Sequence, residues 1–130
     1  MLVKGIDHFT INVVDIEKSI NFYENILQMK KLNFVDMGDH GLTYFYLTES
    51  CRLELIEYYN DDDAKTVAEN TKGTYRHMAL LTDDIKSLRQ ICSEYNIKVK
   101  LEPTDMEKLG CRGMLIEDPN GVEIEIVQKY

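Results

Sequence analysis

The chain contains an internal duplication that limits the folds open to it. In each half a histidine stands seven residues before an Asp-Ile pair, His8 in the first half and His77 in the second. Further along each half, a glutamate lies between aliphatic residues, Glu54 in the first copy and Glu125 in the second. Half of a 130-residue chain is too small to bury a good core by itself. The two copies are therefore predicted to pack together.

Composition and charge narrow the kinds of partner. Hydrophobic residues make up 44% of the chain and charged residues 29%, which is typical of globular rather than disordered proteins. The formal net charge is −8, and no stripe of Lys and Arg interrupts the acidity. Such a chain repels a phosphate backbone and an anionic bilayer surface. We therefore expect no nucleic acid and no membrane as a partner.

The N-terminus and the cysteines bear on the cellular compartment. Residues 1–7 hold no apolar run long enough for a signal peptide, and no stretch of the chain approaches a membrane span. Cys51, Cys92 and Cys111 are an odd number without a CxxC pair, which disfavours a disulfide framework and a thiolate zinc site. The expectation is a soluble, cytoplasmic protein with buried cysteines.

Hydrophobic periodicity predicts the elements of the first copy. Residues 6–13 alternate polar His8, Thr10 and Asn12 with apolar neighbours, which is typical of a half-buried strand with His8 on its polar face. Asp15 is a suitable N-cap for an amphipathic helix that runs to about residue 29. The apolar side of this helix is expected to hold Ile16, Ile20, Tyr23 and Leu27. Three further strands are predicted near residues 32–37, 42–48 and 52–58.

The second copy repeats this order. Residues 59–73, with an acidic run at 60–63, interrupt the pattern and are predicted to connect the halves. Residues 118–121, Asp-Pro-Asn-Gly, predict a hairpin turn, because proline presets the first turn torsion and Asn-Gly accept the left-handed region. The predicted elements are a strand at 75–81, a helix at 84–95 with Ile85, Leu88, Cys92 and Tyr95 on one side, and strands at 98–101, 111–117 and 122–128.

Each copy thus has the order βαβββ, and the fold class is α+β. Two such modules side by side would form a curved eight-stranded mixed sheet with the helices outside. We place module one at about residues 3–58, the linker at about 59–73 and module two at about 74–130, within one domain of residues 1–130. The polar strand positions of both modules would then face the same concavity.

His8, Glu54, His77 and Glu125 are candidate metal ligands. Imidazole and carboxylate together suit nickel, cobalt, iron, manganese or zinc, and two ionised glutamates would cancel the charge of a divalent ion. An ion with six ligands would keep two positions for water or for a substrate with neighbouring oxygens, as a Lewis acid requires. Without a cation, a partly buried glutamate would suffer a desolvation cost on the order of several kcal/mol.

The alternative reading of these residues is structural. A lone histidine on a strand is more often structural or exposed than bound to a metal. Both candidate glutamates could point to solvent from edge strands, as their neighbours Glu57 and Glu123 are expected to do.

Five motifs spread over the chain resemble those of one known superfamily. They are Asp7-His8-Phe9-Thr10-Ile11-Asn12-Val13, Ser19-Ile20-Asn21-Phe22-Tyr23, Leu53-Glu54-Leu55, Arg76-His77-Met78-Ala79 and Glu117-Asp118-Pro119-Asn120-Gly121-Val122-Glu123-Ile124-Glu125. Together they resemble the vicinal oxygen chelate superfamily, which includes glyoxalase I, bleomycin-resistance proteins, methylmalonyl-CoA epimerases, fosfomycin-resistance enzymes and extradiol dioxygenases. The set His8, Glu54, His77 and Glu125 is most similar to that of the short bacterial form of glyoxalase I.

The resemblance implies a function. The four residues would bind a divalent metal ion, with Ni or Co favoured and Zn, Mn or Fe possible. The protein would be a lactoylglutathione lyase-like enzyme, a lyase or isomerase that converts the hemithioacetal of a 2-oxoaldehyde to a 2-hydroxyacyl thioester through a metal-bound enediolate. By analogy, Glu125 is the expected base and Glu54 its counterpart, since coordination of the neighbouring oxygen acidifies the C–H bond.

Two departures from the pattern of glutathione-dependent enzymes leave open which thiol is the cosubstrate. Asn12 stands four residues after His8, where those enzymes usually carry an arginine. Tyr58 stands four residues after Glu54, where they often place an asparagine. Without the arginine, a buried substrate carboxylate would lose a charge-assisted contact worth about 1.5–3 kcal/mol.

Other members of the superfamily give the alternatives. A methylmalonyl-CoA epimerase shares the fold and the proton transfer, but often carries glutamine where this chain has Glu54. A non-catalytic protein like those of bleomycin resistance generally lacks the ligands. A fosfomycin thiol transferase or an iron dioxygenase needs only three protein ligands, so a fourth argues against both. The resemblance also implies a small-molecule substrate and a homodimer, in which a metal site takes its ligands from one chain or from two.

Overall fold

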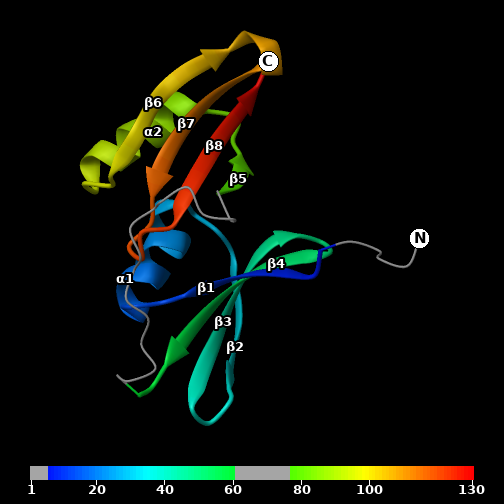
Figure 1. The fold of residues 1–130 in the computed structure, drawn as a ribbon, viewed down its shortest axis with the longest axis vertical. Coiled ribbons are helices and arrows are strands. Elements are labelled where there is room, and N and C mark those ends of the chain that lie inside the picture. Colours follow the sequence, from blue (N-terminus) through cyan, green and yellow to red (C-terminus); the bar gives the residue numbers. More distant parts are fainter. Residues whose placement is uncertain (1–5, 61–76) are drawn as a thin grey trace. The chain divides into compact units, whose positions relative to one another are not determined.

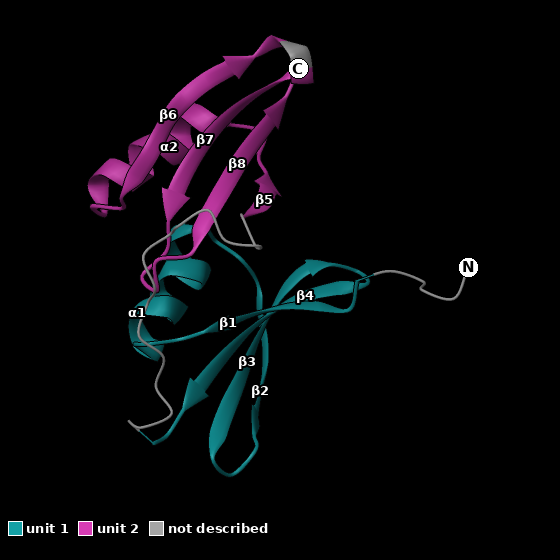
Figure 2. Cartoon of the chain, viewed as in Figure 1, with its two compact units in different colours: residues 1–67 teal, residues 68–130 magenta. Residues whose placement is uncertain are grey.

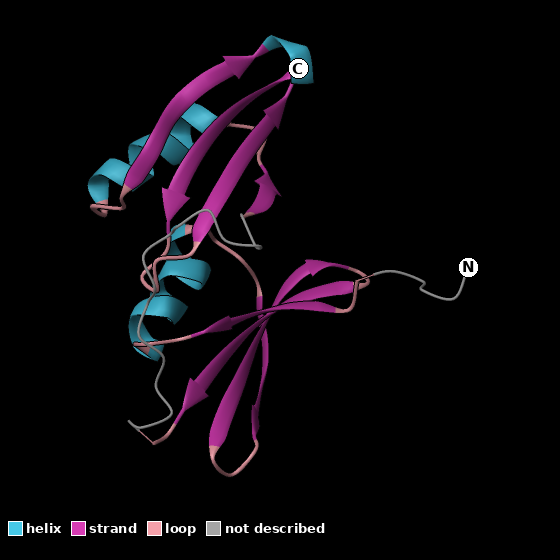
Figure 3. Ribbon diagram, in the orientation of Figure 1, coloured by secondary structure: helices cyan, strands magenta, loops and turns pink. Residues whose placement is uncertain are grey.

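The computed structural model describes residues 6–60 and 77–130, and the chain divides into two compact units, Met1–Val67 and Ala68–Tyr130 (Figure 2). Each unit contains a four-stranded mixed sheet and one α-helix (Figures 1 and 3). The predicted α+β class and the two tandem βαβββ modules are confirmed. Within the described ranges, every helix is too short or too polar to cross a lipid bilayer.

Unit 1 places the strand that carries Glu54 inside its sheet. The strands are β1 (His8–Asn12), β2 (Lys31–Asp36), β3 (His40–Thr48) and β4 (Cys51–Tyr58). Their order in the sheet is β1-β4-β3-β2, and β4 pairs parallel with β1 and antiparallel with β3. Residues His8, Thr10 and Asn12 are exposed along β1 while Ile11 is buried, so the predicted polar face is confirmed.

The first helix starts where it was predicted, and its most deeply buried residues include some that were not predicted. It consists of α1 (Ile16–Ile20) followed by the π-helical segment η1 (Asn21–Ile26), and the Asp15 side chain accepts a hydrogen bond from the Lys18 N–H at its start. The fully buried residues are Ser19, Phe22, Tyr23 and Ile26. Ser19 can be buried because its hydroxyl donates to the Asp15 carbonyl at 2.9 Å. Of the residues predicted for the apolar side, Tyr23 is fully buried, and Ile16, Ile20 and Leu27 are half-buried beside these residues.

Unit 2 repeats the topology. Its strands are β5 (Met78–Leu81), β6 (Val99–Met106), β7 (Cys111–Glu117) and β8 (Glu123–Lys129), in the order β5-β8-β7-β6. The strand that carries Glu125, β8, pairs parallel with β5 and antiparallel with β7. Both candidate glutamates therefore lie on inner strands of their sheets.

Two elements of unit 2 differ from the prediction. The strand expected at 98–101 continues to Met106 as β6, through Pro103. Proline cannot donate to a ladder, but β6 is an edge strand and its register shifts between Leu101 and Thr104, so no partner is lost there. Helix α2 (Ile85–Glu94) buries Ile85 and Cys92 as expected, whereas Tyr95 is exposed. A 3-10 turn, η3 (Glu107–Leu109), follows β6.

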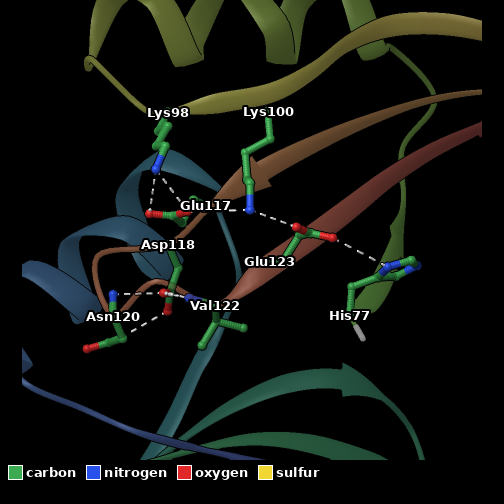
Figure 4. A network of polar contacts seen from close by, with 8 residues as sticks. All are labelled: His77, Lys98, Lys100, Glu117, Asp118, Asn120, Val122 and Glu123. Atoms are coloured by element: carbon green, nitrogen blue, oxygen red, sulfur yellow. Dashed lines mark hydrogen bonds and ion pairs between the residues drawn. The ribbon is translucent and has the colours of Figure 1, made fainter. Parts of the chain in front are cut away.

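The predicted turn at 118–121 joins β7 to β8. One carboxylate oxygen of Asp118 accepts from the backbone N–H groups of Asn120, at 2.7 Å, and Val122, at 2.8 Å (Figure 4). Gly121 has a φ of 82°, which favours glycine. The turn therefore sets the start of the strand that carries Glu125.

The cores of both units are aliphatic and aromatic. Cys51, Cys92 and Cys111 are free and buried, as predicted. Burial raises the pKa of the Cys92 thiol. Most of the predicted linker, and the first residues of the strand predicted at 75–81, lie outside the described residues. A single curved sheet built from both units, and a single domain, remain predictions.

Candidate functional site

Glu54 is a buried carboxylate held by two hydroxyl groups. Its neighbours across β1 and β3 are Thr10 and Tyr44. Thr10 Oγ1 donates to Glu54 Oε1 at 3.0 Å. The Tyr44 hydroxyl also bonds to this carboxylate, and this hydrogen bond, together with burial, raises the pKa of Tyr44. Only 6% of the surface of Glu54 is exposed, so its carboxyl group is held in a fixed place on the polar face of the sheet.

His8 lies on the same face of unit 1 as Glu54. In the parallel pairing of β1 with β4, His8 is opposite Arg52 and Thr10 is opposite Glu54. Side chains two residues apart on a strand point to the same face of the sheet. His8 Nδ1 is 2.6 Å from Asp7 Oδ2, and Arg52 Nη2 donates to the same oxygen at 3.3 Å. These two hydrogen bonds, that of His8 first, hold the pKa of Asp7 below its usual value. The Arg52 guanidinium also stacks 4.6 Å above the centre of the Tyr44 ring.

In unit 2, His77 and Glu125 are in direct contact. Ala79 on β5 is opposite Glu125 on β8, and His77 lies two residues before Ala79, on the same side of the sheet. His77 Nε2 is 3.1 Å from Glu125 Oε2. The Glu125 side chain is 20% exposed, so one of its faces remains accessible. Each unit thus places one predicted histidine and one predicted glutamate on a common face.

A second glutamate faces the other nitrogen of His77. Glu123 Oε1 is 3.8 Å from His77 Nδ1, and Glu123 Oε2 accepts from Lys100 Nζ at 3.0 Å (Figure 4). Lys100 also lies 3.9 Å from Glu117, which pairs with Lys98 at 3.3 Å. The Glu123 side chain is only 2% exposed. The expectation that Glu123 is exposed was wrong: its side chain is buried, and Lys100 supplies the cation that stabilises a buried carboxylate.

Gly113 on β7 leaves room beside Glu125. A Cβ atom at this position would lie 2.9 Å from Met106 Cε and 3.3 Å from Glu125 Oε1. Any side chain here would press on the carboxylate oxygen that does not contact His77. A glycine inside a strand pattern was the available sequence signal for such a close approach.

The sequence pattern singled out the histidine and glutamate that each unit places on one sheet face, and it did not indicate the residues around them. Asp7, Arg52, Lys100 and Glu123 each contact a candidate ligand or its neighbour, yet surface charge in a sequence does not reveal its partner. No group of three or more His, Cys, Asp and Glu side chains within 6–60 and 77–130 is arranged to hold a metal ion. In unit 2 the reason is visible, since Glu123 and Glu125 face opposite nitrogens of His77.

The duplicated βαβββ topology, with an imidazole and a carboxylate on one face of each unit, defines a class of protein. The chain belongs to the Glyoxalase/Bleomycin resistance protein/Dioxygenase superfamily, whose family model matches residues 5–126. The resemblance drawn from the motifs is thus confirmed.

Individual relatives cover nearly the whole chain. The uncharacterized protein YwbC of Bacillus subtilis is 32% identical over 98% of this chain and 100% of its own length. A lactoylglutathione lyase of Neisseria meningitidis is 28% identical over 94% of this chain and 88% of its own. The mitochondrial methylmalonyl-CoA epimerase of Homo sapiens is 26% identical over 86% of this chain and 71% of its own.

A solved structure supports the fold. The trypanothione-dependent glyoxalase I of Leishmania major superimposes with a TM-score of 0.80 and 24% identity, covering 98% of this chain and 88% of that one. At this identity the likeness concerns the fold.

Proposed function

We propose that this chain is a metal-dependent lyase of the glyoxalase I kind. Its substrate would be the hemithioacetal of a 2-oxoaldehyde and its product a 2-hydroxyacyl thioester. The observation that carries the proposal is the recurrence of one imidazole and one carboxylate on a common sheet face in both units. The relatives named lactoylglutathione lyase support the same reaction.

The donor set fits a divalent ion. His8 and Glu54 in unit 1, and His77 and Glu125 in unit 2, are the ligands that we propose, two nitrogen and two oxygen donors of the kind that nickel and cobalt accept. Glu54 is already ionisable, buried and fixed by hydroxyl donors, so a cation would relieve its desolvation without rearrangement. A divalent ion bound there would act as a Lewis acid, polarising a substrate oxygen and acidifying the neighbouring C–H bond.

The two glutamates differ in a way that supports Glu125 as the base. Glu54 accepts from Thr10 and Tyr44, so its oxygens are engaged and its side chain is held still. Among the described residues, only His77 contacts Glu125 through a hydrogen bond, and it does so at Oε2. Glu125 Oε1, the oxygen beside Gly113, can therefore accept a proton from C1 of the substrate and return it to C2.

The thiol is the least constrained part of the substrate. Asn12 is the last residue of β1, lies on the exposed polar face and is opposite Ile56. Its neutral side chain cannot form an ion pair with a carboxylate of the thiol cosubstrate. Tyr58 ends β4 with its ring against His40, 5.4 Å between ring centres. We therefore propose that the enzyme accepts thiols other than glutathione. We also propose a homodimer, the assembly that the family resemblance implies.

A turnover assay tests the proposal. Metal-free protein is reloaded separately with Ni²⁺, Co²⁺ and Zn²⁺, and methylglyoxal is supplied with glutathione, bacillithiol or coenzyme A. We expect thioester formation with Ni²⁺ or Co²⁺, and a loss of about 10²–10⁴-fold in kcat for Glu125→Gln. Failure to form thioester with any combination of metal and thiol would overturn the proposal.

Epimerisation of methylmalonyl-CoA is the second candidate, because epimerases are among the relatives. It needs the same proton transfer and a different substrate. Exchange of the substrate's α-hydrogen for deuterium in ²H₂O, with methylmalonyl-CoA as substrate, would favour epimerisation if it occurred while methylglyoxal was not converted.

A further inference from the structure

Arg52 is the single Lys or Arg on the sheet face that carries His8 and Glu54. Strands β1, β3 and β4 contain no other Lys or Arg, and Lys31 at the start of β2 is opposite Phe45, on the other face. Arg52 is opposite His8 in the pairing of β1 with β4, and it lies two residues before Glu54. Side chains two residues apart on a strand share a face. A cation therefore stands beside both candidate ligands of unit 1.

The guanidinium of Arg52 is held over an aromatic ring. Its Cζ atom lies 4.6 Å from the centre of the Tyr44 ring, within the range of a cation–π contact. The hydroxyl of Tyr44 bonds to Glu54, so the ring that supports Arg52 is itself fixed at the carboxylate. The side chain of Arg52 is nevertheless 40% exposed. The guanidinium is thus both ordered and open to a ligand.

The other arginines in the described ranges use their donors fully. Nε and Nη2 of Arg89 donate to Glu102 at 2.6 and 2.8 Å, and Nε and Nη2 of Arg112 donate to Asp105 at 2.8 and 2.9 Å. Arg52 has one side-chain hydrogen bond within residues 6–60 and 77–130, from Nη2 to a carboxylate oxygen at 3.3 Å. Charge-assisted N–H···O bonds are usually about 2.7–2.9 Å long. Arg52 therefore retains donors, on Nε and Nη1, for a ligand.

Asp7, the acceptor of that one bond, does not account for the place of Arg52. The Asp7 side chain is 73% exposed, and its shorter contact is with His8 Nδ1, at 2.6 Å. An ion pair between exposed side chains contributes little to stability. The contact with Asp7 thus gives no reason in folding for a cation at this position.

The anion that suits Arg52 belongs to the thiol part of the proposed substrate. A 2-oxoaldehyde such as methylglyoxal has no ionised group, so only the thiol can supply a negative charge. A planar guanidinium matches a carboxylate through two parallel hydrogen bonds. A thiol with several phosphates would be repelled by a chain of net charge −8. A single carboxylate is therefore the best match for this one cation.

We propose that Arg52 binds a carboxylate of the thiol cosubstrate and makes the enzyme selective for carboxylate-bearing thiols. The inference rests on the proposed function, because it assigns the thiol arm of the same site. Along β4, Glu54 lies between Arg52 and Ile56, and Ile56 is opposite Asn12 at the end of β1. The carboxylate is thus bound near the start of β1, on the side of Glu54 away from Asn12.

Thioester formation from methylglyoxal with two matched thiols tests this assignment. N-acetylcysteine and N-acetylcysteine amide differ in the carboxylate alone. We expect the Ni²⁺-loaded wild type to have a kcat/KM about tenfold or more higher with the acid than with the amide. Arg52→Met should lower this ratio to about one, chiefly through KM. Arg52→Lys should keep part of the ratio, because lysine retains the charge without the planar fork.

Arg89→Met is the matched control. It removes one positive charge, as Arg52→Met does, but Arg89 lies on α2 and is paired with Glu102. The ratio should keep its wild-type value. If the wild type converts both thiols with equal kcat/KM, or if Arg52→Met lowers both equally, Arg52 binds no carboxylate and the proposed function stands. A loss with coenzyme A and none with N-acetylcysteine would also overturn the assignment.

A binding measurement separates the anion site from the reaction. The S-methylated forms of both thiols are titrated into the full chain with Zn²⁺, and NMR follows the Nε–H resonance of Arg52, which is assigned by its loss in Arg52→Lys. We expect a saturable shift with the acid and none with the amide. If this shift occurs and no thiol yields thioester, the proposed function fails and the anion site stands. The absence of a shift with the acid would overturn the role of Arg52.

Discussion

At the scale of single residues, the site depends on how buried carboxylates are partnered. Glu54 has hydroxyl donors, Glu123 has Lys100, and Glu125 has His77. A carboxylate removed from water is stabilised by such partners, and removing one partner leaves the full desolvation penalty. Substitutions of the partners, rather than of the carboxylates, therefore test the structure most cleanly.

Tyr44→Phe removes one of the two hydroxyl donors to Glu54. We expect the free energy of unfolding to fall by about 1 kcal/mol, because the carboxylate stays buried with one hydrogen bond fewer. Urea denaturation followed by circular dichroism measures the change. Tyr46→Phe is the control, since Tyr46 is exposed two residues along the same strand and should change stability little. Equal effects of the two variants would contradict the role given to Tyr44.

Gly113→Ala would crowd the oxygen of Glu125 that we assign to proton transfer. The added Cβ would lie 3.3 Å from Glu125 Oε1 and 2.9 Å from the flexible end of Met106. We expect the protein to fold and kcat to fall roughly tenfold, because small displacements of a reacting group are costly. Adding Met106→Ala relieves only the methionine contact. If the double variant Gly113→Ala/Met106→Ala had the kcat of the wild type, the added Cβ would not disturb Glu125, which would contradict this prediction.

At the scale of elements, alternation and turn chemistry predicted where each strand lies more accurately than where it begins and ends. The polar face of β1 and the turn at 118–121 follow from local rules, and both are observed. The extension of β6 through Pro103 could not be predicted, because proline is tolerated only on an edge strand and edges are defined by the whole sheet. Burial of Ser19 escaped the hydrophobic pattern because its hydroxyl is satisfied by the helix itself.

The β6–β7 hairpin carries a pH-dependent ion pair. Arg112 donates two hydrogen bonds to Asp105, at 2.8 and 2.9 Å, and Tyr130 donates a third. These contacts, that of Arg112 first, lower the pKa of Asp105 from 3.8 to about 2. The stabilisation is therefore complete above the ordinary pKa and is lost as the pH falls through the lowered one.

Arg112→Met should accordingly lower Tm at pH 7 relative to the wild type. The difference in Tm should stay constant down to about pH 4 and shrink between pH 3.8 and about 2, as Asp105 takes up its proton. Differential scanning calorimetry across this range measures it. In an Asp105→Asn background the same substitution should have little effect at any pH. A Tm difference independent of pH would contradict the assignment.

At the scale of the whole molecule, the duplication accounts for both the fold and the proposed site. Each unit repeats the same strand order and presents one imidazole and one carboxylate on a sheet face. The sequence motifs singled out these four residues as candidates because the two copies repeat the same pattern. The surrounding charges were not predicted, since Asp7 and Glu123 occupy different places in the two copies.

The stoichiometry and ligand dependence of Ni²⁺ binding test the central claim most directly. Titration calorimetry on the metal-free protein should give one Ni²⁺ per chain, and His8→Ala, Glu54→Gln, His77→Ala and Glu125→Gln should each weaken binding strongly. This result would mean that both units contribute ligands to every bound ion. Two ions per chain, or an affinity that depends on the residues of one unit alone, would contradict the account.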